Sequence, residues 1–191
     1  MAGKVRIADE VADKPGRIYD EKCSVRVITD IHPYVSRGGI KLEHALKEFN
    51  IPPSGKVAVD IGASTGGFTD CLLQRGINKV FAVDVGYGQL DWKLQSDDRV
   101  TSLDRKNARE LVFKDIQELV DLVVIDVSFI SLKLIIPSAI NVLKPGGDLV
   151  ALVKPQFEVG KNEVENKGII YFWTKKYLKS SKISCFYACQ Q

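Results

Sequence analysis

The stretch VAVDIGASTGGFTDCLL, from Val57 to Leu73, decides the fold of this chain. Its apolar start predicts a buried strand, a glycine-rich turn follows, and the apolar spacing beyond the turn predicts a helix. Glycines at such a turn let the backbone approach a ligand, and the helix that begins there exposes N–H groups. The sequence therefore predicts a nucleotide-like ligand at this turn.

The same alternation of strand and helix continues on both sides of this stretch. Further strands are predicted at residues 79–85, 99–103, 121–127 and 148–155, and helices at 40–50, 66–76, 113–119 and 131–143. Nearly continuous Val, Ile and Leu in strands separated by helices indicate an α/β fold with a Rossmann-like, mainly parallel sheet covered on both faces. A ligand is expected beyond the carboxyl ends of the strands.

Residues 1–31 have a different pattern. GKVRI and CSVRVI alternate apolar with polar residues and predict strands on either side of a Pro-Gly turn. This β-rich piece is too short to bury a core alone. We expect a linker at residues 32–39 and the α/β domain at residues 40–191.

Composition excludes few classes of protein. The chain has 191 residues, of which 45% are hydrophobic and 27% charged, as in ordinary globular proteins. Its net charge of +3 permits a nucleic-acid partner without arguing for one. Four scattered cysteines and two histidines suggest neither a metal site nor a disulfide framework, so a reducing cytoplasm is expected. No run has the length of a membrane span or the form of a signal peptide.

The glycine-rich turn fits one class of cofactor better than another. The dinucleotide pattern G-x-G-x-x-G begins at Gly62, but Ser64 replaces its second glycine, which disfavours an NAD-linked oxidoreductase. Asp60, at the end of the first strand, suits a cationic group, and Asp84 suits ribose hydroxyls. S-adenosylmethionine offers both features. The alternative is a turn that only tightens the packing.

Charged residues follow two other strands of the predicted sheet. Asp126 ends one strand and Lys154 ends the next. Around one cleft they suggest a proton-handling pair, although either alone reads as a solvated strand end. Lys41 opens the helix before the first strand, and its spacing alone is that of an ordinary exposed lysine.

These residues resemble the TlyA family, the hemolysin-like ribosomal RNA 2′-O-methyltransferases related to FtsJ-type enzymes. The matching stretches are YVSRGGIKLEHAL, DIGASTGGFTDCLL, VFAVDVGYGQLDWKL, DRKNAREL, DLVVIDVSFISL and LVKPQFEVGK, within about residues 34–161. The first 31 residues resemble the second half of an S4-type RNA-binding domain.

The resemblance implies a Lys-Asp-Lys-Glu catalytic tetrad, S-adenosylmethionine as cofactor and no metal. Lys41, Asp126 and Lys154 match its first three members. No segment matches the glutamate, and Glu158 lies too close to Lys154 in the chain to replace it. The end of the chain diverges after about Ile169, and we expect the last two strands of the family's sheet to be missing.

The resemblance also implies the residues that contact cofactor and RNA. The cofactor set is Asp60, Gly62, Ala63, Ser64, Thr65, Gly66, Gly67, Phe68, Asp84, Asn107 and Asp126. Asn107 is expected to reach the adenine edge, and its alternative role is a helix N-cap. The RNA-phosphate set is Arg37, Arg105, Lys106 and Arg109, whose alternative role is a solvated face. Tyr87 and Trp92 either stack on a base or pack inside.

The function implied is methyl transfer to a ribose 2′-hydroxyl, of a cytidine, in ribosomal RNA or ribosomal subunits. One alternative is an RNA- or cofactor-binding protein without turnover, since no catalytic glutamate is found. Another is a pore-forming haemolysin, which no long apolar span or basic amphipathic helix supports. The target nucleotide, the subunit and the oligomeric state stay open.

Overall fold

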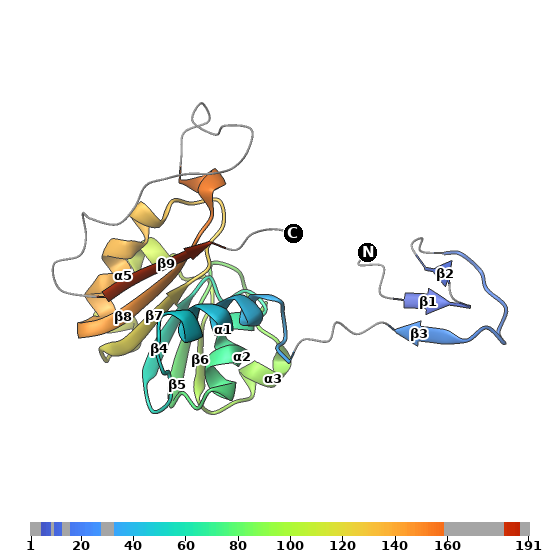
Figure 1. Ribbon diagram of the computed structural model, residues 1–191, viewed down its shortest axis with the longest axis horizontal. Helices are drawn as coiled ribbons and strands as arrows, with labels where there is room; N and C mark the ends of the chain where they lie inside the picture. Colours follow the sequence, from blue (N-terminus) through green and yellow to red (C-terminus); the bar gives the residue numbers. More distant parts are fainter. Residues whose placement is uncertain (1–4, 9, 13–15, 28–32, 159–181, 188–191) are drawn as a thin grey trace. The chain divides into compact units, whose positions relative to one another are not determined.

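The computed structural model describes residues 5–8, 10–12, 16–27, 33–158 and 182–187 (Figure 1). The chain divides into two compact units, residues 1–33 and residues 34–191. The first unit holds an antiparallel sheet of order β2-β1-β3, with β1 at Val5–Ile7, β2 at Glu10–Val11 and β3 at Val25–Val27. None of its described residues is buried, as expected for a piece too short to form a core.

The second unit is built on a six-stranded sheet of order β6-β5-β4-β7-β8-β9. All neighbouring strands are parallel, which confirms the α/β prediction. The strands are β4 (Val57–Ile61), β5 (Lys79–Val83), β6 (Val100–Leu103), β7 (Val120–Ile125), β8 (Leu143–Val153) and β9 (Lys182–Tyr187).

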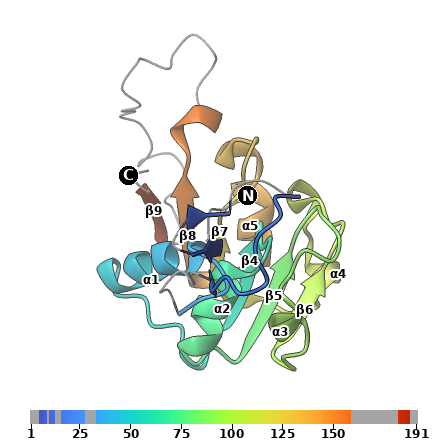
Figure 2. The ribbon, with the colours of Figure 1, turned by 90° about the vertical axis from the view of Figure 1, so that its right-hand side faces the viewer.

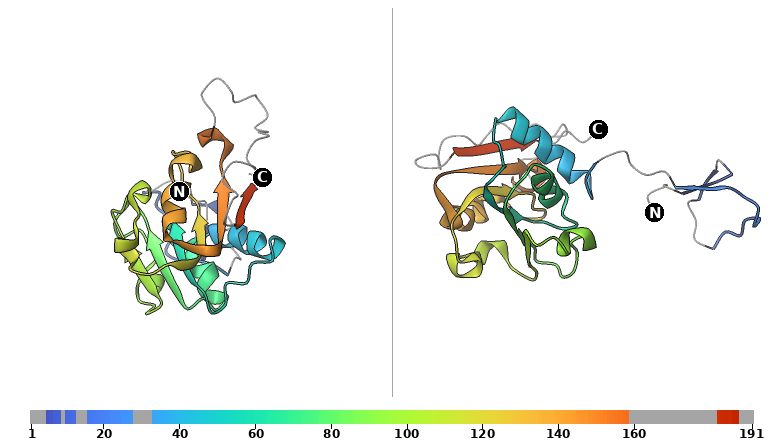
Figure 3. Two further views of the ribbon diagram at one scale, coloured as in Figure 1. Left: turned by 90° about the vertical axis from the view of Figure 1, so that its left-hand side faces the viewer. Right: turned by 90° about the horizontal axis from the view of Figure 1, so that it is seen from below.

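Helices cover both faces of this sheet, as the apolar strands predicted (Figures 2 and 3). They are α1 (Gly38–Glu48), α2 (Gly67–Gln74), α3 (Trp92–Gln95), α4 (Phe113–Ile116) and α5 (Ile136–Val142), with short 3₁₀ turns η1 (Ala108–Glu110), η2 (Leu132–Leu134) and η3 (Pro155–Phe157). Successive strand residues alternate between two buried clusters: Ala58 packs with α1 and α2, and Val59 packs with α5. No helix in the described part of the chain is long and apolar enough to cross a membrane.

The second unit begins earlier than the expected domain start at residue 40. The predicted linker, residues 32–39, extends into it, because the Tyr34 side chain is only 7% exposed and belongs to the core. The Tyr34 ring lies against Gly39, where a Cβ would come within 2.3 Å of it. A glycine at this point of α1 therefore makes room for the ring, and residues 34–39 are part of the α/β unit.

Two other expectations need correction. The sheet has an edge strand, β9, in a segment where the sequence showed no clear period. An edge strand pairs on one side only and needs no long apolar run. The helix predicted at residues 131–143 is split into η2 and α5, and Pro137 stands in the first turn of α5 because proline lacks the N–H that a continuous helix would require.

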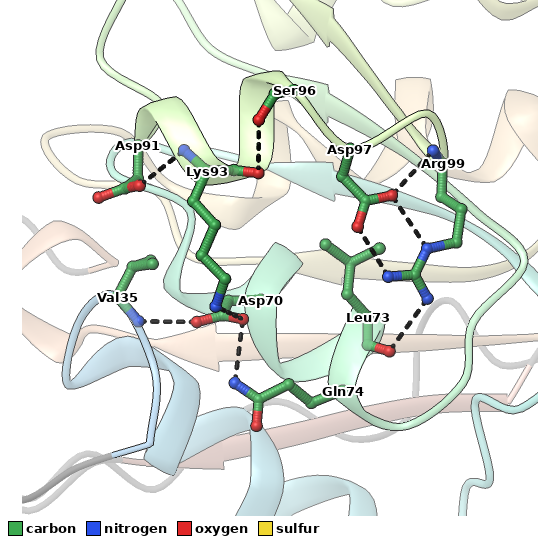
Figure 4. A network of polar contacts seen from close by, with 9 residues as sticks. All are labelled: Val35, Asp70, Leu73, Gln74, Asp91, Lys93, Ser96, Asp97 and Arg99. Carbon is green, nitrogen blue, oxygen red and sulfur yellow. Dashed lines mark hydrogen bonds and ion pairs between the residues drawn. The ribbon is translucent and has the colours of Figure 1, made fainter.

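A network around Asp70 of α2 fastens neighbouring segments to that helix (Figure 4). The buried Asp70 carboxylate accepts the Val35 N–H at 2.8 Å, and the Lys93 ammonium of α3 lies 3.9 Å away. Arg99, at the end of the loop after α3, donates to the Leu73 carbonyl at 3.3 Å. The entry to α1 and the segment beyond β5 are thus both held against α2.

Candidate functional site

A cleft of about 640 Å³ lies beyond the carboxyl ends of β4, β7 and β8. The start of α1, the glycine turn before α2 and the residues that follow β7 and β8 form its walls. The lining residues are Ser36, Arg37, Gly38, Lys41, Gly62, Ala63, Ser64, Thr65, Gly67, Phe68, Asp126, Ser128 and Lys154. The site therefore stands where the sequence predicted a ligand, at the carboxyl edge of a parallel sheet.

The glycine turn is tight as well as open to the cleft. Gly62 has a φ of +84°, and a Cβ there would lie 2.5 Å from the carbonyl oxygen of Asp126. At Gly67 a Cβ would lie 2.1 Å from the Ser36 hydroxyl oxygen. Both positions are crowded, so the packing interpretation holds for them, and the ligand interpretation, which it does not exclude, stays a prediction.

The Asp84 carboxylate holds the glycine turn through hydrogen bonds to backbone N–H groups. One carboxylate oxygen accepts the Ser64 N–H at 2.8 Å, and the other accepts the Gly86 N–H at 2.7 Å. Asp84 itself does not line the cleft, but Ser64, which it holds at a φ of +50°, does. Each oxygen keeps a second lone pair, so this carboxylate can also accept hydroxyl donors, as a ribose would supply.

Asp60 is fully buried beneath the turn. The Thr69 hydroxyl donates to one of its oxygens at 2.7 Å, while the other is buried without a hydrogen-bond partner. The pKa of Asp60 is raised to about 7, chiefly by burial; the Thr69 contact opposes this rise, and the carboxylates of Asp126 and Asp84 add to it. A cation near this group would favour its ionised form, which fits the cationic ligand that the sequence predicted.

The predicted lysine and aspartate meet in the cleft. The Lys154 Nζ lies 2.5 Å from an Asp126 carboxylate oxygen and donates to the Ser128 hydroxyl at 2.8 Å. Both charged side chains are only 22% exposed, so neither is an ordinary solvated strand end. Lys41 lines the same cleft from the first turn of α1. Three residues distant in the sequence are thus gathered at one place.

The other predicted cofactor contacts differ in their position relative to the cleft. Phe68 is buried and lines the cleft, whereas Gly66 and Asn107 do not line it. The Asn107 side chain caps η1 by accepting the Arg109 N–H at 3.1 Å, which is the alternative that the sequence left open. Its contact with an adenine stays a prediction.

The four predicted RNA-contacting residues differ in their surroundings. Arg37 lines the cleft, and the Arg109 side chain lies against Asn107. Lys106 forms an ion pair with Asp115 at 2.8 Å, so its charge is already matched. The Arg105 guanidinium lies 4.4 Å from the centre of the Tyr87 ring. Tyr87 is 71% exposed and Trp92 is 78% exposed, so neither packs inside.

The sequence did not single out several cleft residues. Ser36, Gly38 and Ser128 also line the cleft; Ser128 lies two residues after Asp126, and Gly38 and Ser36 lie three and five residues before Lys41. Phe129, directly after Ser128, is 90% exposed. Adjacency to Asp126 and Lys41 was the signal that could have found them. Within the described ranges, no group of three or more His, Cys, Asp or Glu side chains is arranged to hold a metal.

Comparisons with known proteins agree with this geometry. The family model described as FtsJ-like methyltransferase matches residues 34–191. The chain is 50% identical to YqxC of Bacillus subtilis over 171 residues, covering 89% of this chain and 61% of that protein. It is 48% identical, over 89% of this chain and 64% of the relative, to the 16S/23S rRNA (cytidine-2′-O)-methyltransferase TlyA of Mycobacterium tuberculosis.

A solved structure gives the same result at the level of the fold. A hemolysin-like protein from Streptococcus thermophilus superimposes with a TM-score of 0.72 at 48% identity, covering 87% of this chain and 62% of that one. The chain thus spans about three fifths of the length of the relatives it matches. Because the family model covers most of the sequence, the chain belongs to the FtsJ-like methyltransferase family.

Proposed function

We propose that this chain uses S-adenosylmethionine to methylate a ribose 2′-hydroxyl, of a cytidine, in ribosomal RNA. The observation that carries the proposal is one cleft that gathers the glycine turn with Lys41, Asp126 and Lys154. The 48% identity to a relative named as an rRNA cytidine-2′-O-methyltransferase supports the substrate class. Such a substrate implies action in the cytoplasm, on RNA or ribosomal subunits.

The residues around the glycine turn fit this cofactor. Residues 62–65 and Gly67 of the turn line the cleft, so their backbone is available to a ligand there. Asp84 has lone pairs for the ribose hydroxyls, and the buried Asp60 oxygen without a partner favours a nearby cation. The bound cofactor supplies an electrophilic methyl group.

Lys154 is the candidate for handling the proton of the substrate hydroxyl. A ribose 2′-hydroxyl is a weak nucleophile and must lose its proton as the new bond forms. The contacts of Lys154 with Asp126 and Ser128 use two directions around its nitrogen and leave a third for the substrate oxygen. A neutral amine there removes the proton, and a charged one stabilises the oxyanion. Lys41, which lines the cleft from α1, positions the substrate hydroxyl or the phosphate next to it.

The surface near the cleft offers partners for RNA. Arg37 lines the cleft and suits a phosphate. The exposed Phe129 follows the cleft residue Ser128, and an exposed aromatic ring suits an unstacked base. The Tyr87 ring with Arg105 over it, and Trp92, add exposed stacking surfaces along the segment beyond β5.

Binding of the cofactor is the first test. Calorimetric titration of the chain with S-adenosylmethionine should give saturable binding, and NAD should give none. Asp84→Ala should weaken binding by about tenfold or more, because it removes a charged acceptor and frees Ser64. Binding of NAD instead, or undiminished affinity in Asp84→Ala, would contradict the cofactor assignment.

Methyl transfer is the second test. Ribosomal subunits incubated with methyl-labelled cofactor should gain label in RNA at a position resistant to alkaline cleavage, which marks a 2′-O-methyl group. Lys154→Met should keep cofactor affinity and lose transfer. Cofactor binding without transfer by the unaltered chain would favour the alternative of a binding protein without turnover.

A further inference from the structure

Three polar residues of the cleft, Asp126, Ser128 and Lys154, come from two neighbouring loops. Asp126 and Ser128 follow β7, and Lys154 follows β8. The paired register of these strands ends at Ile125 and Ala151, before any of the three side chains. Contacts between the loops themselves therefore add to the strand pairing in keeping Lys154 against Asp126.

Glu158 supplies such a contact. One of its carboxylate oxygens accepts from the Ser131 hydroxyl at 2.7 Å, and the other accepts from the Leu132 N–H at 2.8 Å. Ser131 caps η2, which follows the loop after β7, and Glu158 directly follows η3, which comes after β8. The rings of Phe129 and Phe157 lie beside this link, with centroids 5.1 Å apart.

We propose that Glu158 is a positioning residue that clasps these two loops, so that the Lys154 amine stays against Asp126 and Ser128. The inference rests on the proposed function, in which Lys154 acts on the substrate hydroxyl. Glu158 does not line the cleft, and both of its oxygens already hold the other loop. Its role is thus to hold the residues that act and not to touch the substrate.

Three variants isolate this role. Glu158→Ala removes both contacts. Glu158→Gln can keep both, because its amide oxygen accepts the Leu132 N–H and its amide N–H donates to the Ser131 hydroxyl. Glu118→Ala is the matched control, since it also removes a carboxylate from an ion pair. Glu118 pairs with Lys79 at 2.8 Å, and Lys79 is the first residue of β5, at the amino ends of the strands and away from the cleft.

The first readout does not depend on activity. The rate at which a small acylating reagent modifies Lys154, followed by mass spectrometry, reports how well its amine is held. Glu158→Ala should raise this rate several-fold relative to exposed Lys114, and Glu158→Gln and Glu118→Ala should not. An unchanged rate in Glu158→Ala would overturn the clasp, even if the unaltered chain transfers no methyl group and the proposed function fails.

The second readout is the rate of transfer. Glu158→Ala should lower kcat by roughly ten- to a hundredfold, because misplacement of a reacting group by about 1 Å has effects of this size. KM and cofactor affinity should stay unchanged, and Glu158→Gln should restore kcat. Loss of cofactor binding or of the folded state would reveal a purely structural role and overturn the proposal. Ser131→Ala, which removes one contact, should give a smaller fall in kcat, and an unaltered kcat there would also count against it.

Discussion

At the scale of single residues, the surroundings of a carboxyl group decide what it does. Asp60 is the last residue but one of β4, and Asp84 and Asp126 directly follow β5 and β7, yet the three differ in burial and partners. Asp60 is buried against a hydroxyl, Asp84 accepts two backbone N–H groups, and Asp126 faces a lysine. The same residue type therefore occurs as a buried acid, as a holder of the turn and as one half of an ion pair.

Asp60 makes cofactor affinity depend on pH. Its pKa of about 7 in the free protein means that the carboxyl is largely protonated at lower pH. A bound cation favours the ionised form, so binding should release a proton, and affinity should rise from about pH 6 to about pH 8. Calorimetry in buffers of different protonation enthalpy measures this release. Asp60→Asn should abolish the part of the pH dependence due to this group, and an identical profile in both proteins would refute the assignment.

At the scale of elements, the turn between β4 and α2 determines how closely the strand ends approach. Gly62 passes over the carbonyl of Asp126, whereas Gly55, in the loop before β4, has a φ of +75° with no atom within 4 Å of a Cβ. The two glycines share a backbone conformation and differ in space. Comparing alanine substitutions at the two positions therefore separates the cost of backbone strain from the cost of a steric clash.

Substitution of these glycines by alanine should cost different amounts of stability. Gly55→Ala should lower the free energy of unfolding by about 1 kcal/mol, because only backbone strain is added. Gly62→Ala should lower it by roughly 3 kcal/mol or more, since the new methyl group also displaces the end of β7. Urea unfolding curves measure both. Equal losses of stability would contradict the close approach of Gly62 to the Asp126 carbonyl.

At the scale of the whole molecule, the described cleft belongs to one unit. Every lining residue and every buried residue described lies at residue 34 or later. Residues 1–33 form a separate unit with no buried described residue. The core that supports the cleft therefore does not require the first unit, whose S4-type RNA-binding role stays a prediction.

Removal of residues 1–32 should separate cofactor binding from RNA binding. The shortened chain should bind S-adenosylmethionine as well as the full chain, because the cleft and its core are retained. Its affinity for ribosomal RNA should fall if the first unit supplies phosphate contacts, and the salt dependence of binding should become shallower. Titrations at several salt concentrations measure both. Equal RNA affinity of the two chains would exclude an RNA-binding role for the first unit.

The sequence by itself determined the parallel α/β sheet, its two helical faces and the place of the glycine turn, because strand and helix periods are local properties of the chain. The tertiary structure decided what meets in the cleft. It brought Asp126 and Lys154 together at the carboxyl ends of neighbouring parallel strands, and the packing of α1 placed Lys41 in the same cleft. It also added the edge strand β9 and the clasp at Glu158. Such contacts join residues far apart in the sequence, and no local pattern encodes them.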